Sequence, residues 1–237
     1  MEDIPKATIT YNDMEYEEEM QMPISSEEMQ MFIEVGKLVS YKRAQLTKQG
    51  KKLSPSGSRD ISGRATENVI REHLMKHGLN ISNTRVGIEG APLEIDLISL
   101  KLGINPTKTI YYPHEVDTVL EIKNNAVADQ TTEIKKNFNR LRQLTAVIRF
   151  AAIVLSEREG YKYAIREDQL GYPVFTLICR TVSAGRWMWS ESETLIVRDK
   201  IMSRGKTIGR KAMEETGEWH GLLDYLRVRN AKSGMIG

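Results

Sequence analysis

Hydrophobic residues recur along this chain at two spacings, one typical of helices and one typical of strands. A spacing of three to four residues predicts helices over about 26–47 and 64–77, and a third that begins near residue 129. Short, dense apolar runs predict strands near residues 84–89, 93–100, 116–123, 150–155 and 174–179. The order helix, three strands, helix, strand between 64 and 156 therefore predicts a mixed α/β core, with a sheet covered on both faces.

Polar residues mark the ends of the predicted helices and place one acid on a buried face. Ser25 and Glu28 have the spacing of a capping box at the start of the first helix. Gly78 closes the second helix. On that second helix Glu67 lies three residues before Ile70, which puts a carboxylate on the core-facing side.

Changes in composition divide the chain into four parts. Residues 1–24 are acidic and weakly periodic, so we expect a loose N-terminal arm. Residues 25–59 hold the first helix and then a basic linker rich in Gly, Ser and Pro, which is typical of a flexible loop. We assign residues 60–182 to the core, and residues 183–237, which are basic and contain all three tryptophans, to an extension packed on it.

The net charge of +2 hides an uneven distribution of acids and bases. Residues 1–36 carry ten acidic side chains and a single basic one, so residues 37–237 carry a net charge of +11. A basic body suits nucleic acid, whose phosphates attract Lys and Arg, although such faces are also ordinary solvated surface. The positions that we consider for nucleic-acid contact are Lys51, Lys52, Arg64, Lys135, Lys136 and Arg140.

Cysteine content and hydropathy limit the class of protein. Cys179 is the single cysteine, which rules out an intrachain disulfide framework and a cysteine zinc cluster. No apolar run approaches the roughly 20 residues that span a bilayer, and no signal-peptide pattern is present. We therefore expect a soluble, cytoplasmic protein with no membrane partner.

Charged side chains interrupt two of the predicted strands. Glu94 and Asp96 lie two apart in one strand, and Glu121 and Lys123 lie two apart in the next, so each pair shares a face of its strand. Buried charge is costly unless it is paired or bound to a metal. If the strands are neighbours, Asp96, Glu121 and Lys123 converge, and the two carboxylates could hold a magnesium ion. A metal there would polarise a phosphoryl oxygen and activate water, while the Lys123 ammonium stabilised charge on the phosphate.

These residues resemble the signature of a known superfamily. Glu94-Ile95-Asp96, an apolar run and then Glu121-Ile122-Lys123 at the end of the next strand resemble the PD-(D/E)xK nucleases over about residues 60–156. The resemblance implies a restriction-endonuclease-like core, in which a central mixed sheet is flanked by helices. The cofactor that it implies is Mg²⁺, with Mn²⁺ able to substitute. The site residues that it implies are Asp96 and Glu121 as metal-binding acids, Lys123 as the catalytic lysine, Glu67 as a catalytic helix acid beside the metal, and Ile122 as a further metal-binding position.

A looser resemblance concerns one branch of this superfamily. The order of Gly63-Arg64 and Glu67 opening a helix, then a strand pair, Asp96, and residues 119–123 is similar to the branch with trimeric DNA-degrading effectors of antiviral defence, which respond to cyclic nucleotides. This implies a metal-dependent DNA endonuclease of the restriction or defence type, which hydrolyses phosphodiester bonds with metal-activated water. It also implies double-stranded DNA as the partner, a homo-oligomer of two or three chains, and an activating nucleotide ligand.

Two features of the motif leave its details open. The Pro-Asp dipeptide of the superfamily is absent, since Pro92 precedes Asp96 by four residues, and Glu94 therefore competes with Asp96 as the metal-binding acid. The triplet Glu133-Ile134-Lys135 also has the form Glu-x-Lys, but it lies on a predicted helix, where it is ordinary surface charge. The strand setting, rather than the triplet, carries the prediction.

Other interpretations compete with a metal site. The strand charges could form a cross-strand ion pair, which contributes roughly 0.2–1 kcal/mol. Glu67 could pair with an arginine of its own helix, Arg64 or Arg71. The protein could also be a non-catalytic nucleic-acid-binding or assembly module that retains the nuclease fold. An unrelated carboxylate hydrolase, such as a glycosidase, would use an acid pair without needing Lys123.

Overall fold

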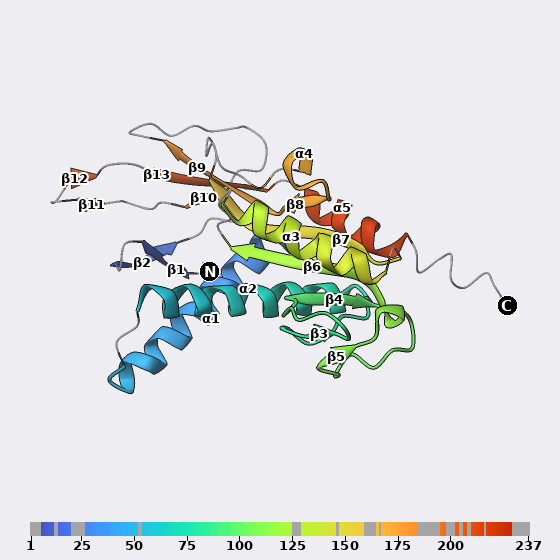
Figure 1. Cartoon of the computed structure of the whole chain (residues 1–237). Coiled ribbons are helices and arrows are strands. Elements are labelled where there is room, and N and C mark those ends of the chain that lie inside the picture. The colour runs from blue at the N-terminus through green and yellow to red at the C-terminus, as the bar shows by residue number, and fades with distance from the viewer. Residues whose placement is uncertain are drawn as a thin grey trace.

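The computed structural model has a central sheet of seven strands (Figure 1). It describes residues 6–11, 14–19, 27–51, 54–124, 129–145, 147–158, 165, 167–183, 195–197, 202–203, 206–207, 210–215 and 217–228. The strands are β4 (Leu97–Leu100), β6 (Val116–Asn124), β7 (Arg149–Arg158), β8 (Val174–Thr176), β9 (Ile178–Ser183), β10 (Leu195–Val197) and β13 (Arg210–Glu215). Their order is β10, β13, β9, β7, β6, β4, with β8 beside β7. The sheet is mixed, because β6, β8 and β9 run parallel to β7 whereas β4 and β13 pair antiparallel with their neighbours.

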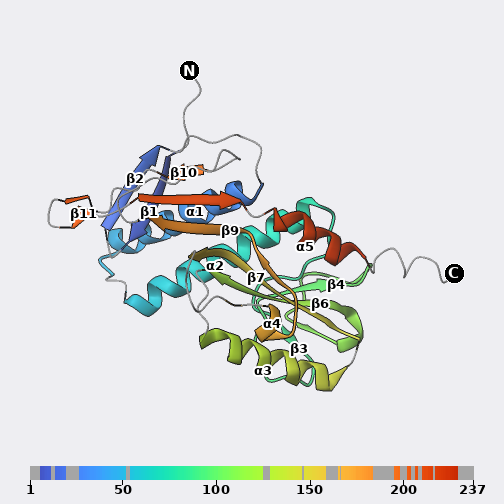
Figure 2. The same ribbon diagram turned by 90° about the horizontal axis from the view of Figure 1, so that it is seen from above.

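Helices cover both faces of this sheet, as Figures 1 and 2 show from two directions. They are α1 (Glu27–Lys48), α2 (Pro55–Lys76), α3 (Asp129–Leu144), α4 (Glu167–Leu170) and α5 (Glu218–Arg227). Alternate residues of β6 belong to two separate cores, as strand geometry requires. Leu120 and Ile122 pack with residues of α1, α2 and α5, whereas Val119 packs with residues of α3 and α4. The predicted α/β class, with a sheet covered on both faces, is confirmed.

The order of elements through the core also follows the prediction. After α2 come β4 and β6, then α3 and β7, with short pieces between them. The shorter elements are β3 (Gly87–Ile88), β5 (Ile110–Tyr111), the 3₁₀ helix η1 (Pro113–Glu115), β11 (Met202–Ser203) and β12 (Lys206–Thr207). The strand predicted over 174–179 is divided into β8 and β9 at Leu177, whose buried side chain joins the core and whose N–H donates to Val154 O over 2.8 Å. Among the described helices, none combines the length and hydropathy needed to cross a membrane.

The N-terminal stretch contains an antiparallel hairpin, so the predicted loose arm over residues 1–24 is wrong where the structure describes it. β1 (Lys6–Tyr11) pairs with β2 (Met14–Glu19). The register places Ile9 opposite Tyr16 and Lys6 opposite Glu19. β-Branched and aromatic residues such as Ile9 and Tyr16 favour strands. The acidic composition of this stretch concealed that pattern.

The predicted linker is also shorter than expected, because α2 begins at Pro55 rather than at Arg64. Ser54 caps the helix by accepting a hydrogen bond from Gly57 N at 3.1 Å. Pro55 occupies the first turn, where its fixed φ favours a helix and its missing N–H costs nothing. The boundary that we predicted between residues 59 and 60 therefore falls inside a helix, and the one between 182 and 183 falls inside β9.

A polar network joins the start of α1 to α2 and α5. Glu27 accepts hydrogen bonds from Trp219 Nε1 at 2.8 Å and lies 2.8 and 2.7 Å from ring nitrogens of His73 and His77. The buried Glu28 accepts a bond of 3.0 Å from Trp219 N, at the start of α5. Ser25, the other member of the predicted capping box, lies outside the described residues. These contacts join α1 to α5 at the edge of one core, and Glu28 and Trp219 are 191 positions apart in the chain.

Candidate active site

The pairing between β4 and β6 stops where the candidate residues lie. The antiparallel ladder ends at the pair Leu97–Leu120. Residues 95–96 turn instead toward residues 85–86, which they join through backbone hydrogen bonds of 2.9–3.0 Å. Two residues further along β6, the N–H of Ile122 donates to a side chain, the Oδ2 of Asp96, over 2.7 Å. The strands therefore separate at this point, and a carboxylate takes a place that a backbone carbonyl would otherwise fill.

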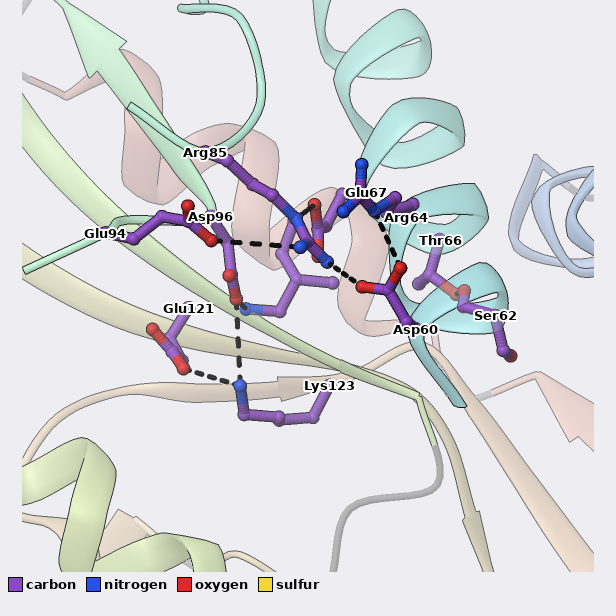
Figure 3. A network of polar contacts seen from close by, with 11 residues as sticks. Asp60, Ser62, Arg64, Thr66, Glu67, Arg85, Glu94, Asp96, Glu121 and Lys123 are labelled. Carbon is purple, nitrogen blue, oxygen red and sulfur yellow. Dashed lines mark hydrogen bonds and ion pairs between the residues drawn. The ribbon is translucent and has the colours of Figure 1, made fainter. Parts of the chain in front are cut away.

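Three of the predicted side chains converge at this separation, as Figure 3 shows. The Nζ of Lys123 lies 2.5 Å from Glu121 Oε1 and 3.8 Å from Asp96 Oδ2. The side chains of Asp96, Glu121 and Lys123 are only 17, 15 and 23% exposed. Strand alternation predicted that they would meet if the strands were neighbours, and the structure brings them together.

The electrostatics of the site leave it short of positive charge. Burial and the nearby charge of Asp96 raise the pKa of Glu121 to about 7. Burial also raises the pKa of Asp96, although the Lys123 ammonium opposes that shift. Burial alone would lower the pKa of Lys123, but the charges of Glu121 and Asp96 outweigh it and leave that pKa raised. Lys123 and the Arg85 guanidinium both lower the pKa of Asp96, and Lys123 lowers that of Glu121, but neither carboxylate has its burial fully compensated.

The structure separates the two acids that competed for the metal in the sequence. The Glu94 side chain is 65% exposed and lies 3.8 Å from Arg85, whereas Asp96 lies beside Lys123. The strand predicted over 93–100 is correct only from Leu97 onward. Strand alternation therefore does not apply to residues 94 and 96, whose side chains differ in exposure. Geometry favours Asp96 as the partner of Glu121.

Glu67 lies on the core-facing side of α2, as predicted, and is buried. Both of its oxygens accept hydrogen bonds from Arg85: Oε2 from Nε at 3.1 Å and Oε1 from Nη2 at 3.3 Å. Burial raises the pKa of Glu67, and the hydrogen bond from Arg85 opposes the shift. The arginines that we considered as its partners bind elsewhere, Arg64 to Asp60 and Arg71 to Ser82 O. To bind a metal, Glu67 would have to give up its hydrogen bonds with Arg85.

Arg85 is the residue of this site that the sequence did not reveal. Its guanidinium contacts Asp60 Oδ1 at 3.1 Å as well as Glu67 and Glu94. Its backbone is left-handed, with φ of 59°, and it is the only non-glycine residue in the described part of the chain with a positive φ. For a residue with a long side chain this conformation costs about 1–3 kcal/mol and persists where surrounding contacts enforce it. The sequence predicted only an extended strand over 84–89, which gave Arg85 no special role.

The residues considered for nucleic-acid contact are placed on the surface where they are described. Lys51, Arg64, Lys135, Lys136 and Arg140 are exposed, and Lys52 lies outside the described residues. Arg64 lies near the carboxylate network in Figure 3, on the same helix as Glu67. The three residues of α3 lie on the helix that covers the opposite face of the sheet from α2.

The residues present fit a hydrated divalent cation better than a preformed metal cage. Among the described residues, no three His, Cys, Asp or Glu side chains are arranged as a ready metal-binding cluster. Magnesium is usually held by one or two carboxylates, with water and substrate phosphate completing its octahedron. Asp96 and Glu121 supply two such carboxylates, and the cations beside them do not offset their burial. Ile122 could add only its backbone carbonyl, because its side chain has no donor atom.

Comparison with known proteins gives matches in structure but not in sequence. No protein-family model matches the chain, and no curated protein matches it significantly in sequence. The cAAA-bound form of NucC from P. aeruginosa ATCC27853 is similar at 14% identity and a TM-score of 0.43, over 85% of this chain and 91% of that chain. The cAAA-bound form of NucC from E. coli MS115-1 gives 14% and 0.42, over 85% and 90%. The apo form of the E. coli protein gives 15% and 0.40, over 73% and 84%.

Proposed function

We propose that this protein is a metal-dependent nuclease that hydrolyses phosphodiester bonds in double-stranded DNA. Asp96 and Glu121 hold Mg²⁺ or Mn²⁺, and Lys123 stands beside the reacting phosphate. The observation that carries the proposal is the pair of mostly buried carboxylates, both with raised pKa, which share one lysine where β4 and β6 separate. Such a site lacks the charge that a divalent cation would bring.

The pKa directions distinguish a metal site from the simpler alternative of a structural ion pair. A carboxylate in a well-compensated ion pair has its pKa lowered by the opposite charge. Glu121 and Asp96 both have raised pKa values even though Lys123 lies within 4 Å of each. The cations near these two carboxylates therefore form an incomplete ion pair with them, because they do not offset the burial of either one. A glycosidase acid pair would leave the close placement of Lys123 without a role.

Each side chain has a definite part in the proposed reaction. A bound divalent cation would polarise the phosphate and make water a better nucleophile at neutral pH. The hydrogen bond from Ile122 N fixes the carboxylate of Asp96, while Glu121 holds Lys123 Nζ at 2.5 Å. Because its pKa is raised, Lys123 remains an ammonium. It therefore acts as a donor that orients water and stabilises charge growing on the phosphate, rather than as a base.

The test of this function is incubation of supercoiled plasmid with the protein and Mg²⁺ or Mn²⁺, with and without EDTA. We expect the supercoiled form to be lost only when metal is present. Because cAAA is bound in two of the similar structures, this nucleotide is the first activator to add. Plasmid that stays intact with both metals, at several ionic strengths and with cAAA would contradict the nuclease proposal and favour the non-catalytic DNA-binding module.

The proposed assembly, a homo-oligomer of two or three chains, is tested separately from cleavage. Sedimentation or light scattering with and without cAAA would give the number of chains and any change on adding the nucleotide. A monomer at all concentrations would contradict this part of the proposal without affecting the catalytic residues.

The stability of the protein should depend on pH and metal together. Without metal, the folded pKa of Glu121, about 7, lies above its ordinary value of 4.5. The stabilisation that this proton gives is present below about pH 4.5 and is lost as pH rises through 7. The loss is on the order of 3 kcal/mol, or roughly 5–10 °C in melting temperature. Because Mg²⁺ binds the ionised carboxylates, its stabilising effect should be larger at pH 8 than at pH 5.

Thermal melts at the two pH values, with EDTA and with Mg²⁺, measure this effect. The matched control is Glu121→Gln, which removes the titrating group at nearly constant volume. It should raise the melting temperature of the metal-free protein at pH 8 and reduce the response to Mg²⁺. An equal response of the variant and the wild type to Mg²⁺ would remove Glu121 from the metal site.

A further inference from the structure

Arg85 lies beside the metal-binding acids without being one of the predicted catalytic residues. Figure 3 shows the Asp96 carboxylate between two cationic groups, the Arg85 guanidinium on one side and the Lys123 ammonium on the other. We propose that the Arg85 guanidinium contacts a non-bridging oxygen of the scissile phosphate, and that Glu67 positions Arg85 instead of binding the metal. This inference rests on the nuclease function proposed above.

The side chain of Arg85 is held from one side by acids of α2. Glu67 accepts from Nε and Nη2 with both carboxylate oxygens, at 3.1 and 3.3 Å, which fixes the plane of the guanidinium. Asp60, about two turns earlier on α2, lies 3.1 Å from Nη2. Glu67 is buried, so its pairing with Arg85 is shielded from water. The orientation of the guanidinium is therefore set before any substrate arrives.

The remaining part of the guanidinium faces a contact that is easily exchanged. Nη1 lies 3.8 Å from Glu94, whose side chain is 65% exposed, and Arg85 itself is 26% exposed. Exposed ion pairs of this kind contribute little to stability. A phosphate oxygen matches the planar fork of arginine far better, and arginine stays charged at any pH that the protein tolerates. A substrate phosphate can thus replace Glu94 while Glu67 and Asp60 keep hold of the other nitrogens.

The backbone of Arg85 ties this cation to the metal-binding acid. Arg85 N donates to Asp96 O at 3.0 Å, and the neighbouring residues Val86 and Ile95 bond in both directions. The left-handed conformation of Arg85, with φ of 59°, belongs to this turn. Strained positions of this kind concentrate at functional sites, where the geometry that they enforce is needed. Here the geometry sets a guanidinium beside Asp96 at a fixed place in the backbone.

At this position, Arg85 can stabilise the negative charge that develops on the phosphate during hydrolysis. As water attacks, negative charge grows on the oxygens of the phosphate, and preorganised donors around it lower the barrier. Asp96 and Glu121 suffice to hold a single cation, and Glu67 is already engaged by Arg85. Arg85 then supplies the positive charge that a second metal ion would otherwise provide. No bond to Arg85 forms or breaks in the reaction; its contribution is electrostatic and positional.

The test must separate a substrate contact from simple neutralisation of Glu67. Arg85→Gly keeps the left-handed backbone but leaves the Glu67 carboxylate buried without its partner, so the single variant could lose stability. The double variant Arg85→Gly/Glu67→Gln removes both charges together. We expect it to melt cooperatively and to respond to Mg²⁺ as the wild type does, yet to cleave plasmid about 100-fold more slowly or worse. Arg85→Lys should keep part of the activity.

A second readout measures the phosphate contact without cleavage. Binding of a short DNA duplex is followed by fluorescence anisotropy in EDTA at several salt concentrations. In the double variant Arg85→Gly/Glu67→Gln, loss of one phosphate contact should reduce the slope of the logarithm of the DNA-binding constant against the logarithm of salt concentration by about 0.9. Arg227→Ala is the matched control, because this exposed arginine lies at the end of α5 near the start of β7, away from the carboxylates.

Several results would overturn the assignment of Arg85. A double variant that cleaves at the wild-type rate would show that Arg85 only neutralises Glu67. A double variant that loses its response to Mg²⁺ would return Glu67 to the metal site. If the DNA binding of the double variant had the same salt dependence as that of the wild type, a contact between Arg85 and a phosphate would be excluded, even if the variant cleaved slowly. Failure of the proposed nuclease function has a different signature, since the wild-type protein itself would then leave plasmid intact.

Discussion

Replacing Lys123 by methionine is expected to slow plasmid cleavage at least about 100-fold while the protein still folds and binds DNA. Methionine keeps the length and the apolar stem of the side chain but removes the ammonium, which lies 2.5 Å from Glu121 and 3.8 Å from Asp96. Two effects contribute to the loss. The donor beside the phosphate disappears, and the pKa of Glu121 rises further, because Lys123 is one of the groups that hold it down.

The two contributions of Lys123 can be separated by pH and metal concentration. At pH 9 with excess Mg²⁺, Glu121 is ionised in the variant as well, so any remaining defect reports the donor. Lys76→Met is the control, since Lys76 is exposed at the far end of α2. A Lys123→Met protein that cuts at the normal rate at pH 7 would remove the lysine from the mechanism. Recovery at pH 9 would limit its role to setting the charge of Glu121.

Asp96→Asn should abolish both cleavage and the response to Mg²⁺, whereas Glu94→Gln should leave both nearly unchanged. The reason is position: Asp96 accepts from Ile122 N at 2.7 Å and lies beside Lys123, while Glu94 is 65% exposed and lies near Arg85. Asparagine retains an oxygen that can accept from Ile122, so the local backbone should be preserved. Its loss of charge should also lower the pKa of Glu121, whose upward shift comes partly from Asp96.

Plasmid cleavage and metal-dependent thermal melts measure this pair of variants side by side. We expect a loss of cleavage of at least about 100-fold for Asp96→Asn. Without metal at pH 8, Asp96→Asn should melt at a higher temperature than the wild type, because one of two repelling carboxylates is gone. Equal losses of activity in the two variants would make both acids essential. A larger loss in Glu94→Gln would reverse the assignment of the metal-binding acid.

The sequence predicted that Asp96, Glu121 and Lys123 would converge if their two strands were neighbours, and the pairing of β4 with β6 meets this condition. Apolar runs identify the strands, period-two alternation places Glu121 and Lys123 on one face of β6, and buried charge is rare enough to need an explanation. The same rules identified Glu67 as an acid on a buried helix face. They could not decide between Glu94 and Asp96, because the strand begins only at Leu97.

Arg85 illustrates what local rules cannot provide. Its partners Glu67 and Asp60 lie 18 and 25 positions earlier in the chain, and they meet it only after α2 has packed on the sheet. Its left-handed backbone follows from tertiary hydrogen bonds to residues 95–96 rather than from any preference of arginine.

The start of α2 shows a different kind of ambiguity. A serine followed by proline is a frequent loop signal, but the same dipeptide can cap a helix and begin it. Composition predicted a loop over residues 48–59. In the structure, Gly57 N donates a hydrogen bond to the Ser54 side chain, and α2 begins at Pro55. The acidic composition of residues 1–24 likewise favoured a loose arm, whereas β1 pairs with β2.

The bonds from Trp219 to Glu27 and Glu28 set the stage of chain synthesis at which one core of the sheet can close. One core of the sheet is completed by α5, whose buried residues pack beside those of α1. A chain emerging from the ribosome therefore cannot finish this core until the region around residue 219 has been made. Under the proposed nuclease function, cleavage can therefore begin only after α5 has been made and this core has closed. Truncated products that end before α5 should lack both a stable fold and cleavage.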